Sequence, residues 1–290
     1  MSRRPPISKY SSYLMLLPGL VLCVLFLIVP FGLMVTISLY QNISPATMVL
    51  SGFSFENYIG FFSKGTSYII LANTFGNSLL ACLACLLIGY PFAYLLSYSV
   101  KNEKVKSYMV SLLIVPFLID TSIRMIAWIP ILGNQGAINQ LLLSLHVVQN
   151  PLSLLYNVGA LQILWLQGYV LFMIFPIYLA LNRIDPDLIA AAKVLRASPQ
   201  NVFYYIVFKL SLPGVICGCI FVFVSTLGDY ITPLFIGGGI QTLGLSVSDY
   251  ANSFAWPYAA ALSTMLTGVA IAVLYILLKV VNIKELIYER

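Results

Sequence analysis

The sequence predicts an all-α membrane protein with six transmembrane helices. Of its 290 residues, 60% are hydrophobic and only 8% are charged, and the mean hydropathy is +0.96. A soluble domain typically has about 25% charged residues. Six apolar runs each reach the roughly 20 residues that a helical crossing of the bilayer needs. None of them shows the two-residue alternation of a membrane strand, so helices are expected to satisfy the backbone.

The six apolar runs occupy most of the chain, and each predicts one helix. They lie near residues 13–40, 69–98, 108–132, 157–181, 212–236 and 258–281. The first run is too long for a cleaved signal peptide and no small-residue cleavage site follows it, so we expect it to remain as a helix. No soluble domain interrupts the series, which predicts a single transmembrane domain over residues 1–290.

The basic residues predict how the helices are oriented. Cytoplasmic loops of membrane proteins retain Lys and Arg, and alternate loops here differ by thirteen basic residues to one, with Arg124 left inside a span. The thirteen are Arg3, Arg4, Lys9, Lys101, Lys104, Lys106, Arg183, Lys193, Arg196, Lys209, Lys279, Lys284 and Arg290. Both termini are therefore predicted to be cytoplasmic. The net charge of +6 then reflects topology and gives no reason to expect nucleic-acid binding.

Catalytic and metal-binding patterns are not found in the sequence. All five cysteines fall within predicted spans; Cys82 and Cys85 lie three residues apart, but no second pair or nearby His completes a metal site, so we expect them to serve packing. The one histidine, His146, is expected at the surface of an outer loop. No acid–base pair, nucleophile arrangement or phosphate-binding run is present, so the chain is not predicted to be an enzyme.

A polar segment near residues 182–211 interrupts the apolar runs. Asp185 can cap a helix whose first position is Pro186, with Asp187 in the first turn, and this helix is expected to end near residues 198–199. Its apolar side chains recur at three- and four-residue spacing at Leu188, Ala191, Ala192 and Leu195. Such a helix can lie on lipid headgroups or dock against another protein. The small alanine side chains favour close approach to a protein.

This segment resembles the "EAA" loop of binding-protein-dependent ABC importer permeases. The matching residues are Ala190, Ala191 and Ala192, then Arg196, then "FKLSLPG" with Leu212 and Pro213. Further stretches resemble the spermidine/putrescine branch of that family, in particular its B-type permease subunit. They are "NSLLACLACLLIGYPFAYLLS" (77–97), "LLIVPFLIDTSIRMIAWIPILGNQGAIN" (112–139) and "LGDYITPLFIGGG" (227–239). The resemblance covers nearly the full length of the chain.

The resemblance implies a type I ABC importer permease fold and a place in a larger assembly. The expected partners are a second permease in a heterodimer, two ATPase subunits and an extracytoplasmic solute-binding protein. ATP and Mg would bind the ATPase subunits, and no cofactor is expected on this chain. The location implied is the bacterial cytoplasmic (inner) membrane, which the chain would cross several times. The helix at 185–198 would be the coupling helix that contacts an ATPase subunit.

Seven residues are the expected contacts of the coupling helix: Asp187, Leu188, Ala190, Ala191, Ala192, Leu195 and Arg196. Two of them depart from the family pattern, because the family has an acid at the position of Ala190 and a glycine at that of Arg196. The lost acid removes a charge-assisted contact, whose contribution would be about 1.5–3 kcal/mol. We therefore expect Asp187 or Arg196 to supply a substitute, or the partner permease to hold its ATPase more tightly.

Charged residues inside spans are costly and usually face a cavity or a partner. Asp120 and Arg124 lie four residues apart, so they share a helix face and are expected to pair. Asp229, beside Tyr230, has no partner nearby in the sequence and could bind a passing cation. These four residues and Trp128 are the candidates for the translocation pathway. Trp128, Trp165 and Trp256 also fit interfacial anchors.

The solute expected from these features is small and cationic, and a polyamine such as spermidine or putrescine is the first choice. The same branch of the family resembles importers of aminophosphonates, opines and iron, which remain alternatives. A self-sufficient secondary transporter is the alternative from another class. It would need several intramembrane acids or repeated halves with broken helices, and the sequence has one unpaired intramembrane acid and no evident repeat.

Overall fold

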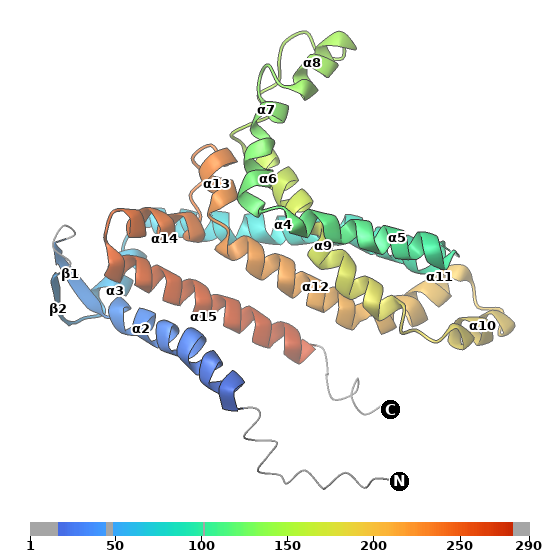
Figure 1. The fold of residues 1–290 in the computed structure, drawn as a ribbon, viewed down its shortest axis with the longest axis horizontal. Helices are drawn as coiled ribbons and strands as arrows, with labels where there is room; N and C mark the ends of the chain where they lie inside the picture. The colour runs from blue at the N-terminus through green and yellow to red at the C-terminus, as the bar shows by residue number, and fades with distance from the viewer. Residues whose placement is uncertain (1–16, 45–48, 101, 281–290) are drawn as a thin grey trace, which may run out of the picture. The chain divides into compact units, whose positions relative to one another are not determined.

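The computed structural model describes residues 17–44, 49–100 and 102–280 (Figure 1). The chain forms two compact units, Met1–Lys64 with Val247–Met265 (unit 1) and Gly65–Ser246 with Leu266–Arg290 (unit 2). The single domain expected over residues 1–290 stays a prediction. The basic residues of the amino-terminal tail, Lys101, Lys284 and Arg290, which support the predicted orientation, lie outside the described residues.

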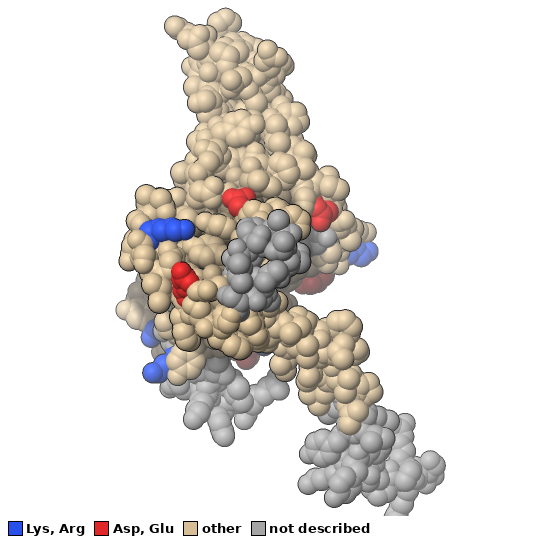
Figure 2. All heavy atoms as spheres, turned by 90° about the vertical axis from the view of Figure 1, so that its left-hand side faces the viewer, with Lys and Arg blue, Asp and Glu red and all other residues tan. Residues whose placement is uncertain are grey.

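Five helical segments among the described residues are long and apolar enough to cross a membrane. They are Leu17–Ser38, Gly65–Tyr98, Val158–Leu181, Pro199–Gly228 and Trp256–Lys279. Their bounds agree with the second, fourth and sixth predicted spans to within four residues, and the first agrees over residues 17–38. Figure 2 shows one face of the molecule, on which broad uncharged areas separate the few charged side chains. Such a surface suits contact with hydrocarbon.

The third predicted span, 108–132, is wrong as a single continuous helix. The chain there forms α5 (Glu103–Ile114), the 3-10 helix η2 (Val115–Leu118), α6 (Thr121–Ala127) and α7 (Ile129–Leu132). The break follows from local chemistry: Pro116 has no N–H to donate, Ile119 is extended, and the Asp120 carboxylate accepts from the N–H of Ser122 at 2.8 Å and so begins a new helix.

The fifth span also differs from its prediction at both ends. The span begins at Pro199 and not near residue 212. Residues 202–210, which were expected in the polar loop, are helical and belong to the span. The segment consists of α11 (Pro199–Val202), the π-helix η3 (Phe203–Phe208) and α12 (Lys209–Gly228). It ends at Gly228, and a separate short helix, α13 (Ile231–Ile236), follows. The polar loop is therefore shorter than the predicted 182–211.

Unit 1 contains a hairpin between two helices. The π-helix η1 (Val24–Ile28) and α2 (Val29–Ser38) precede the antiparallel strands β1 (Tyr40–Ser44) and β2 (Val49–Phe53), and α3 (Glu56–Phe62) follows. The Asn57 amide donates to the carbonyl oxygens of Ser38 and Tyr40 at 2.9 and 2.8 Å. The Tyr58 hydroxyl is 2.7 Å from the Ser38 hydroxyl. These bonds fix α3 against the end of α2.

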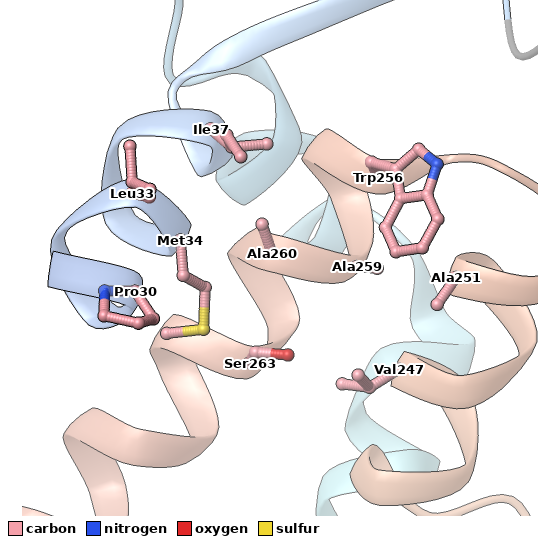
Figure 3. A pocket seen from close by; sticks show the side chains of 10 residues that line it. All are labelled: Pro30, Leu33, Met34, Ile37, Val247, Ala251, Trp256, Ala259, Ala260 and Ser263. Carbon is pink, nitrogen blue, oxygen red and sulfur yellow. The ribbon is translucent and has the colours of Figure 1, made fainter. Parts of the chain in front are cut away.

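A mostly apolar pocket lies within unit 1 (Figure 3). Its walls come from α2, from the last part of α14 (Leu243–Asn252) and from the first part of α15 (Trp256–Val280). The lining residues are Pro30, Leu33, Met34, Ile37, Val247, Ala251, Trp256, Ala259, Ala260 and Ser263. Trp256 therefore lines a pocket of unit 1 and is 44% exposed.

The core of unit 2 is built by α4 (Gly65–Tyr98), α9 (Val158–Leu181) and α12, which pack together in Figure 1. Small residues allow the helices to approach closely. A Cβ on Gly214 would lie 2.5 Å from the Pro176 carbonyl oxygen, and a Cβ on Gly89 would lie 3.0 Å from the Met173 side chain. Buried between α4 and α12, the Tyr90 hydroxyl is 3.0 Å from the Ser211 hydroxyl.

Buried polar side chains hold two of the shorter segments of unit 2 in place. In α8 (Ala137–Ser144), the buried Asn139 amide donates to the carbonyl oxygens of Gly133 and Leu152 and accepts from the Leu152 N–H. The Leu243 N–H, where α14 begins, donates to the Thr74 hydroxyl of α4 at 2.8 Å. The last short helix, α10 (Pro186–Val194), follows α9.

We expect Gly214→Ala to lower the thermal unfolding midpoint of the full chain purified in detergent. The added methyl group would meet backbone atoms that cannot move without displacing α9, and overpacking of this kind costs about 1–3 kcal/mol. Gly76→Ala in α4 is the matched control, because a Cβ there meets nothing within 4 Å. It should leave the midpoint unchanged or raise it. Equal midpoints for the two variants would contradict the close packing of α9 and α12.

Candidate functional site

The helix predicted to couple to an ATPase begins as expected. Asp185 caps α10, and its carboxylate accepts from the Asp187 N–H at 2.9 Å. Pro186 occupies the first turn, where its missing N–H leaves no bond unmade. The helix ends at Val194, several residues before the predicted end, because Ser198 caps a different helix by accepting from the Asn201 N–H at 3.3 Å.

Arg196 closes α10 in a left-handed backbone conformation, with φ at 55°. The N–H of Ala197 donates to the Ala192 carbonyl, and the N–H of Arg196 donates to the Lys193 carbonyl, both at 3.0 Å. This pair of bonds is the Schellman arrangement, which usually places glycine where Arg196 stands. The geometry therefore accounts for the glycine of the family pattern, and an arginine here is strained.

The two faces of α10 have different surroundings. Ile189 and Ala192 pack against the core of unit 2, and Ala192 is buried. Leu188, Val194 and the capping residue Leu195 are exposed, Leu195 to 83%. The remaining predicted contact residues, Asp187, Ala190, Ala191 and Arg196, are exposed as well. Ala192, by contrast, is buried and holds the helix to the spans, and its predicted part in the coupling contact stays a prediction.

The second candidate region is the break between α12 and α13, where Asp229 lies 8% exposed. One carboxylate oxygen, Oδ1, accepts from the N–H groups of Ile231 and Thr232 at 2.9 and 3.2 Å. The other, Oδ2, accepts from Trp165 Nε1 at 2.7 Å, from the Tyr169 hydroxyl at 3.2 Å and from the Thr232 hydroxyl. Five donors therefore surround a carboxylate that the sequence left without a partner.

Two of these donors come from α9 and were not identified from the sequence as partners of Asp229. Trp165 was expected at a membrane interface, but it is fully buried at 0% exposure. Tyr169 lies one turn further along the same face of α9. The one available signal was the three- to four-residue spacing of a buried indole and a phenol in an apolar span, which often indicates a polar partner on another helix.

Asp120 and Arg124 do not form the expected ion pair in the described part of the chain. Asp120 is exposed and caps α6, whereas Arg124 donates to the Thr121 hydroxyl at 3.3 Å. The Arg124 Nε is buried, and the described residues offer it no hydrogen-bond acceptor. The pair does not form because Asp120 precedes the first turn of α6 as its cap. Its carboxylate points to the backbone N–H of that turn.

The structure brings four of the five predicted pathway residues into one region and separates them from α10. α6, which carries Arg124, packs against α13, which follows Asp229 and Tyr230. Trp128 packs against a buried cluster of Met125, Leu132, Ala160, Leu164 and Ile236. This cluster joins α6 and α7 to α9 and α13. Tyr230 is 43% exposed beside the buried Asp229.

We expect Asp229→Asn to lower the unfolding midpoint in the absence of any solute. An amide nitrogen would replace one acceptor oxygen and leave donors of α9 or α13 unsatisfied, at a cost of about 1–3 kcal/mol. Tyr169→Phe removes a single neutral donor and should cost less. An unchanged midpoint for Asp229→Asn, together with a higher solute concentration for uptake, would instead show that the carboxylate acts on solute.

Arg196→Gly should raise the unfolding midpoint, because glycine adopts the left-handed conformation without the Cβ clash, a relief of about 1 kcal/mol. Ser198→Gly is the control: its backbone is extended, so glycine offers no such relief, and the loss of its cap to the Asn201 N–H should leave the midpoint unchanged or slightly lower. A lower midpoint for Arg196→Gly would mean that the arginine side chain makes a stabilising contact that outweighs the strain.

Comparisons with known proteins agree with this architecture. A family model for binding-protein-dependent transport system inner membrane components matches residues 86–284. The spermidine/putrescine transport system permease protein PotB of Escherichia coli (strain K12) is 31% identical over 246 residues, which cover 84% of this chain and 88% of PotB. The inner membrane ABC transporter permease protein YdcU of the same strain is 29% identical over 257 residues, 81% of each chain.

Among solved structures, a bacterial alginate ABC transporter, crystallised with its alginate pentasaccharide-bound periplasmic protein, has a similar fold. One of its chains superposes with a TM-score of 0.70 at 15% identity, over 93% of both chains. The match of the family model and the extent of the similarity to PotB decide the assignment. The chain belongs to the binding-protein-dependent transport system inner membrane components, and it is a permease component of an ABC importer.

Proposed function

We propose that this permease moves a small cationic solute, with a polyamine such as spermidine or putrescine as the first choice. The observation that carries the proposal is the similarity to PotB, a spermidine/putrescine permease, over 84% of the chain. Importers of aminophosphonates, opines or iron remain the alternative within the family. The buried Asp229 carboxylate at the α12–α13 break also supports a cationic solute. All five of its hydrogen-bond donors are neutral, and no ion pair among the described residues balances its negative charge.

The proposed assembly contains a second permease, two ATPase subunits and an extracytoplasmic solute-binding protein. ATP and Mg would bind the ATPase subunits, and this chain would bind no cofactor. The permease then contributes the pathway and its response to ATP hydrolysis, while the binding protein sets much of the selectivity.

Coupling to the ATPase is proposed at the exposed face of α10. Leu188 lies exposed on α10 and Leu195 lies exposed at its end, and an ATPase groove that covered them would bury apolar area at each. Ile189 and Ala192 attach the helix to the core formed with α4, α9 and α12. If the ATPase displaced α10, the buried residues of α10 would carry α9 and α12 with it. The movement would therefore reach these spans as a rigid-body displacement.

The pathway is proposed to pass the region of Tyr230, Arg124 and Trp128. Tyr230 is exposed beside the break between α12 and α13 and can contact a solute. The buried Asp229 carboxylate fixes the backbone at this break and contributes a negative electrostatic potential there. Asp120, exposed at the start of α6, is a second negative group in the same segment.

The test is ATP hydrolysis by the assembly reconstituted in lipid from this chain and the partners encoded beside it. Hydrolysis is measured with binding protein that is empty or loaded with spermidine, putrescine or an aminophosphonate. Stimulation by a polyamine-loaded protein is the expected result, and stimulation by the aminophosphonate form alone would contradict the polyamine assignment. Uptake by this chain without any ATPase would favour a secondary transporter.

Leu195→Asp or Leu188→Asp should reduce ATP hydrolysis in this assay to the unstimulated rate. Both side chains are exposed, so the change should alter the unfolding free energy by no more than about 0.5 kcal/mol, while a charge would oppose docking in an apolar groove. Val105→Asp, at an exposed apolar position of α5, is the matched control and should retain stimulation. Full stimulation of the Leu195 and Leu188 variants would rule out this face of α10 as the docking site.

A further inference from the structure

A groove opens between one side of α10 and the adjoining ends of α4, α5 and α9. All its walls belong to unit 2, and its volume is about 450 Å³. One water molecule occupies about 30 Å³ in the liquid, so the groove has room for a polyatomic group. Ser97 and Tyr98 of α4, Lys106 of α5 and Lys193 of α10 contribute its polar lining.

The two lysines give the groove a positive charge without a compensating carboxylate. Lys106 Nζ donates to the Asn182 side-chain oxygen at 3.1 Å and lies 5.6 Å from the centre of the Tyr178 ring, and both partners are neutral. Throughout the described ranges neither Lys106 nor Lys193 forms an ion pair. Two ammonium groups on one groove repel each other, and an anion between them would remove that cost.

Two hydroxyl groups at the same place have no partner. Ser97 Oγ and Tyr98 Oη are buried, and neither finds a hydrogen-bond partner in the part of the chain that the structure describes. Both oxygens are screened from solvent, so neither meets an anion in the groove unless its side chain rotates, and Tyr98 also lines a second pocket beside α11. The charge of the two lysines therefore carries the argument for an anion.

Ala190 lines this groove too. The family that the coupling segment resembles has an acid at this position, and a carboxylate there would stand on the same wall as Lys193. In this chain a methyl group takes its place, so the groove keeps its two positive charges.

We propose that the groove binds the phosphate group of an anionic phospholipid. Basic pockets between the ends of membrane helices on the cytoplasmic side are suited to such headgroups, and this groove lies where α4 and α9 end and α5 begins. The inference rests on the proposed function, in which α10 faces the cytoplasm. A bound phosphate would join α10, through Lys193, to α5, through Lys106, and would hold the coupling helix against the spans.

The test is hydrogen exchange of the α10 backbone amides in the full chain, without ATPase, in nanodiscs of phosphatidylcholine alone or mixed with phosphatidylglycerol. Phosphatidylglycerol should slow exchange about tenfold, because the anionic headgroup opposes local opening of α10. The double variant Lys106→Gln, Lys193→Gln should lose this effect. Lys104→Gln, which changes an exposed lysine of α5 outside the groove, is the matched control and should keep it.

Ala190→Glu gives a second test that does not depend on the lysine variants. Its carboxylate should occupy the groove, slow exchange in phosphatidylcholine alone and remove the response to phosphatidylglycerol, whereas Ala190→Gln should behave like the parent chain. Equal protection by inorganic phosphate in phosphatidylcholine discs would overturn the lipid assignment in favour of a free anion.

Two further results would also overturn the proposal. One is a phosphatidylglycerol effect that persists in the double lysine variant. The other is protection that appears only when the ATPase subunit is added and that needs both lysines, which would assign the groove to an acidic side chain of that partner. Because the lipid comparison itself is made without ATPase, a failure of the lipid proposal leaves the proposed coupling function intact, and failed ATPase stimulation would not affect the lipid result.

Discussion

The close contact of α9 with α4 and α12 is the constraint on which the rest of unit 2 depends. Gly214 lets the backbones of α9 and α12 approach at Pro176, and Gly89 admits the Met173 side chain from the α4 side. Trp165 and Tyr169 project from one part of α9 to the break at Asp229, while its last turn leads into α10. Trp165 and Leu181 are roughly 24 Å apart along the helix. One rigid element thus connects the two candidate regions.

Features encoded by neighbouring residues were predictable from the sequence. Uninterrupted apolar runs predicted the spans built on α4, α9 and α15, and Asp185 followed by Pro186 predicted the start of α10. The breaks at Asp120 and Asp229 were missed because hydropathy stays high across them. Their stability comes from backbone N–H groups and, at Asp229, from side chains some sixty residues away. Sequence spacing therefore suggested a pair of Asp120 with Arg124, whereas caps and tertiary contacts determine where these side chains turn.

The two departures from the family pattern in the coupling segment have separate physical effects. Arg196 stands where the backbone turns left-handed, so it adds strain and places a positive charge at the exposed end of α10. Ala190 changes the other flank, where it leaves Lys106 and Lys193 without a nearby negative charge. Both changes make the surroundings of α10 more positive. The helix itself keeps its cap and its buried residues, so apart from the strain at Arg196 the two departures act through the charge around α10.

The hydrogen bonds to Asp229 also limit how this sequence can drift over evolutionary time. The indole of Trp165 has a single donor, so replacing Asp229 would leave that N–H without its acceptor in a dry interior. Replacing Trp165 would leave the carboxylate with four other donors. Position 165 is therefore expected to vary more readily than position 229 in descendants of this chain.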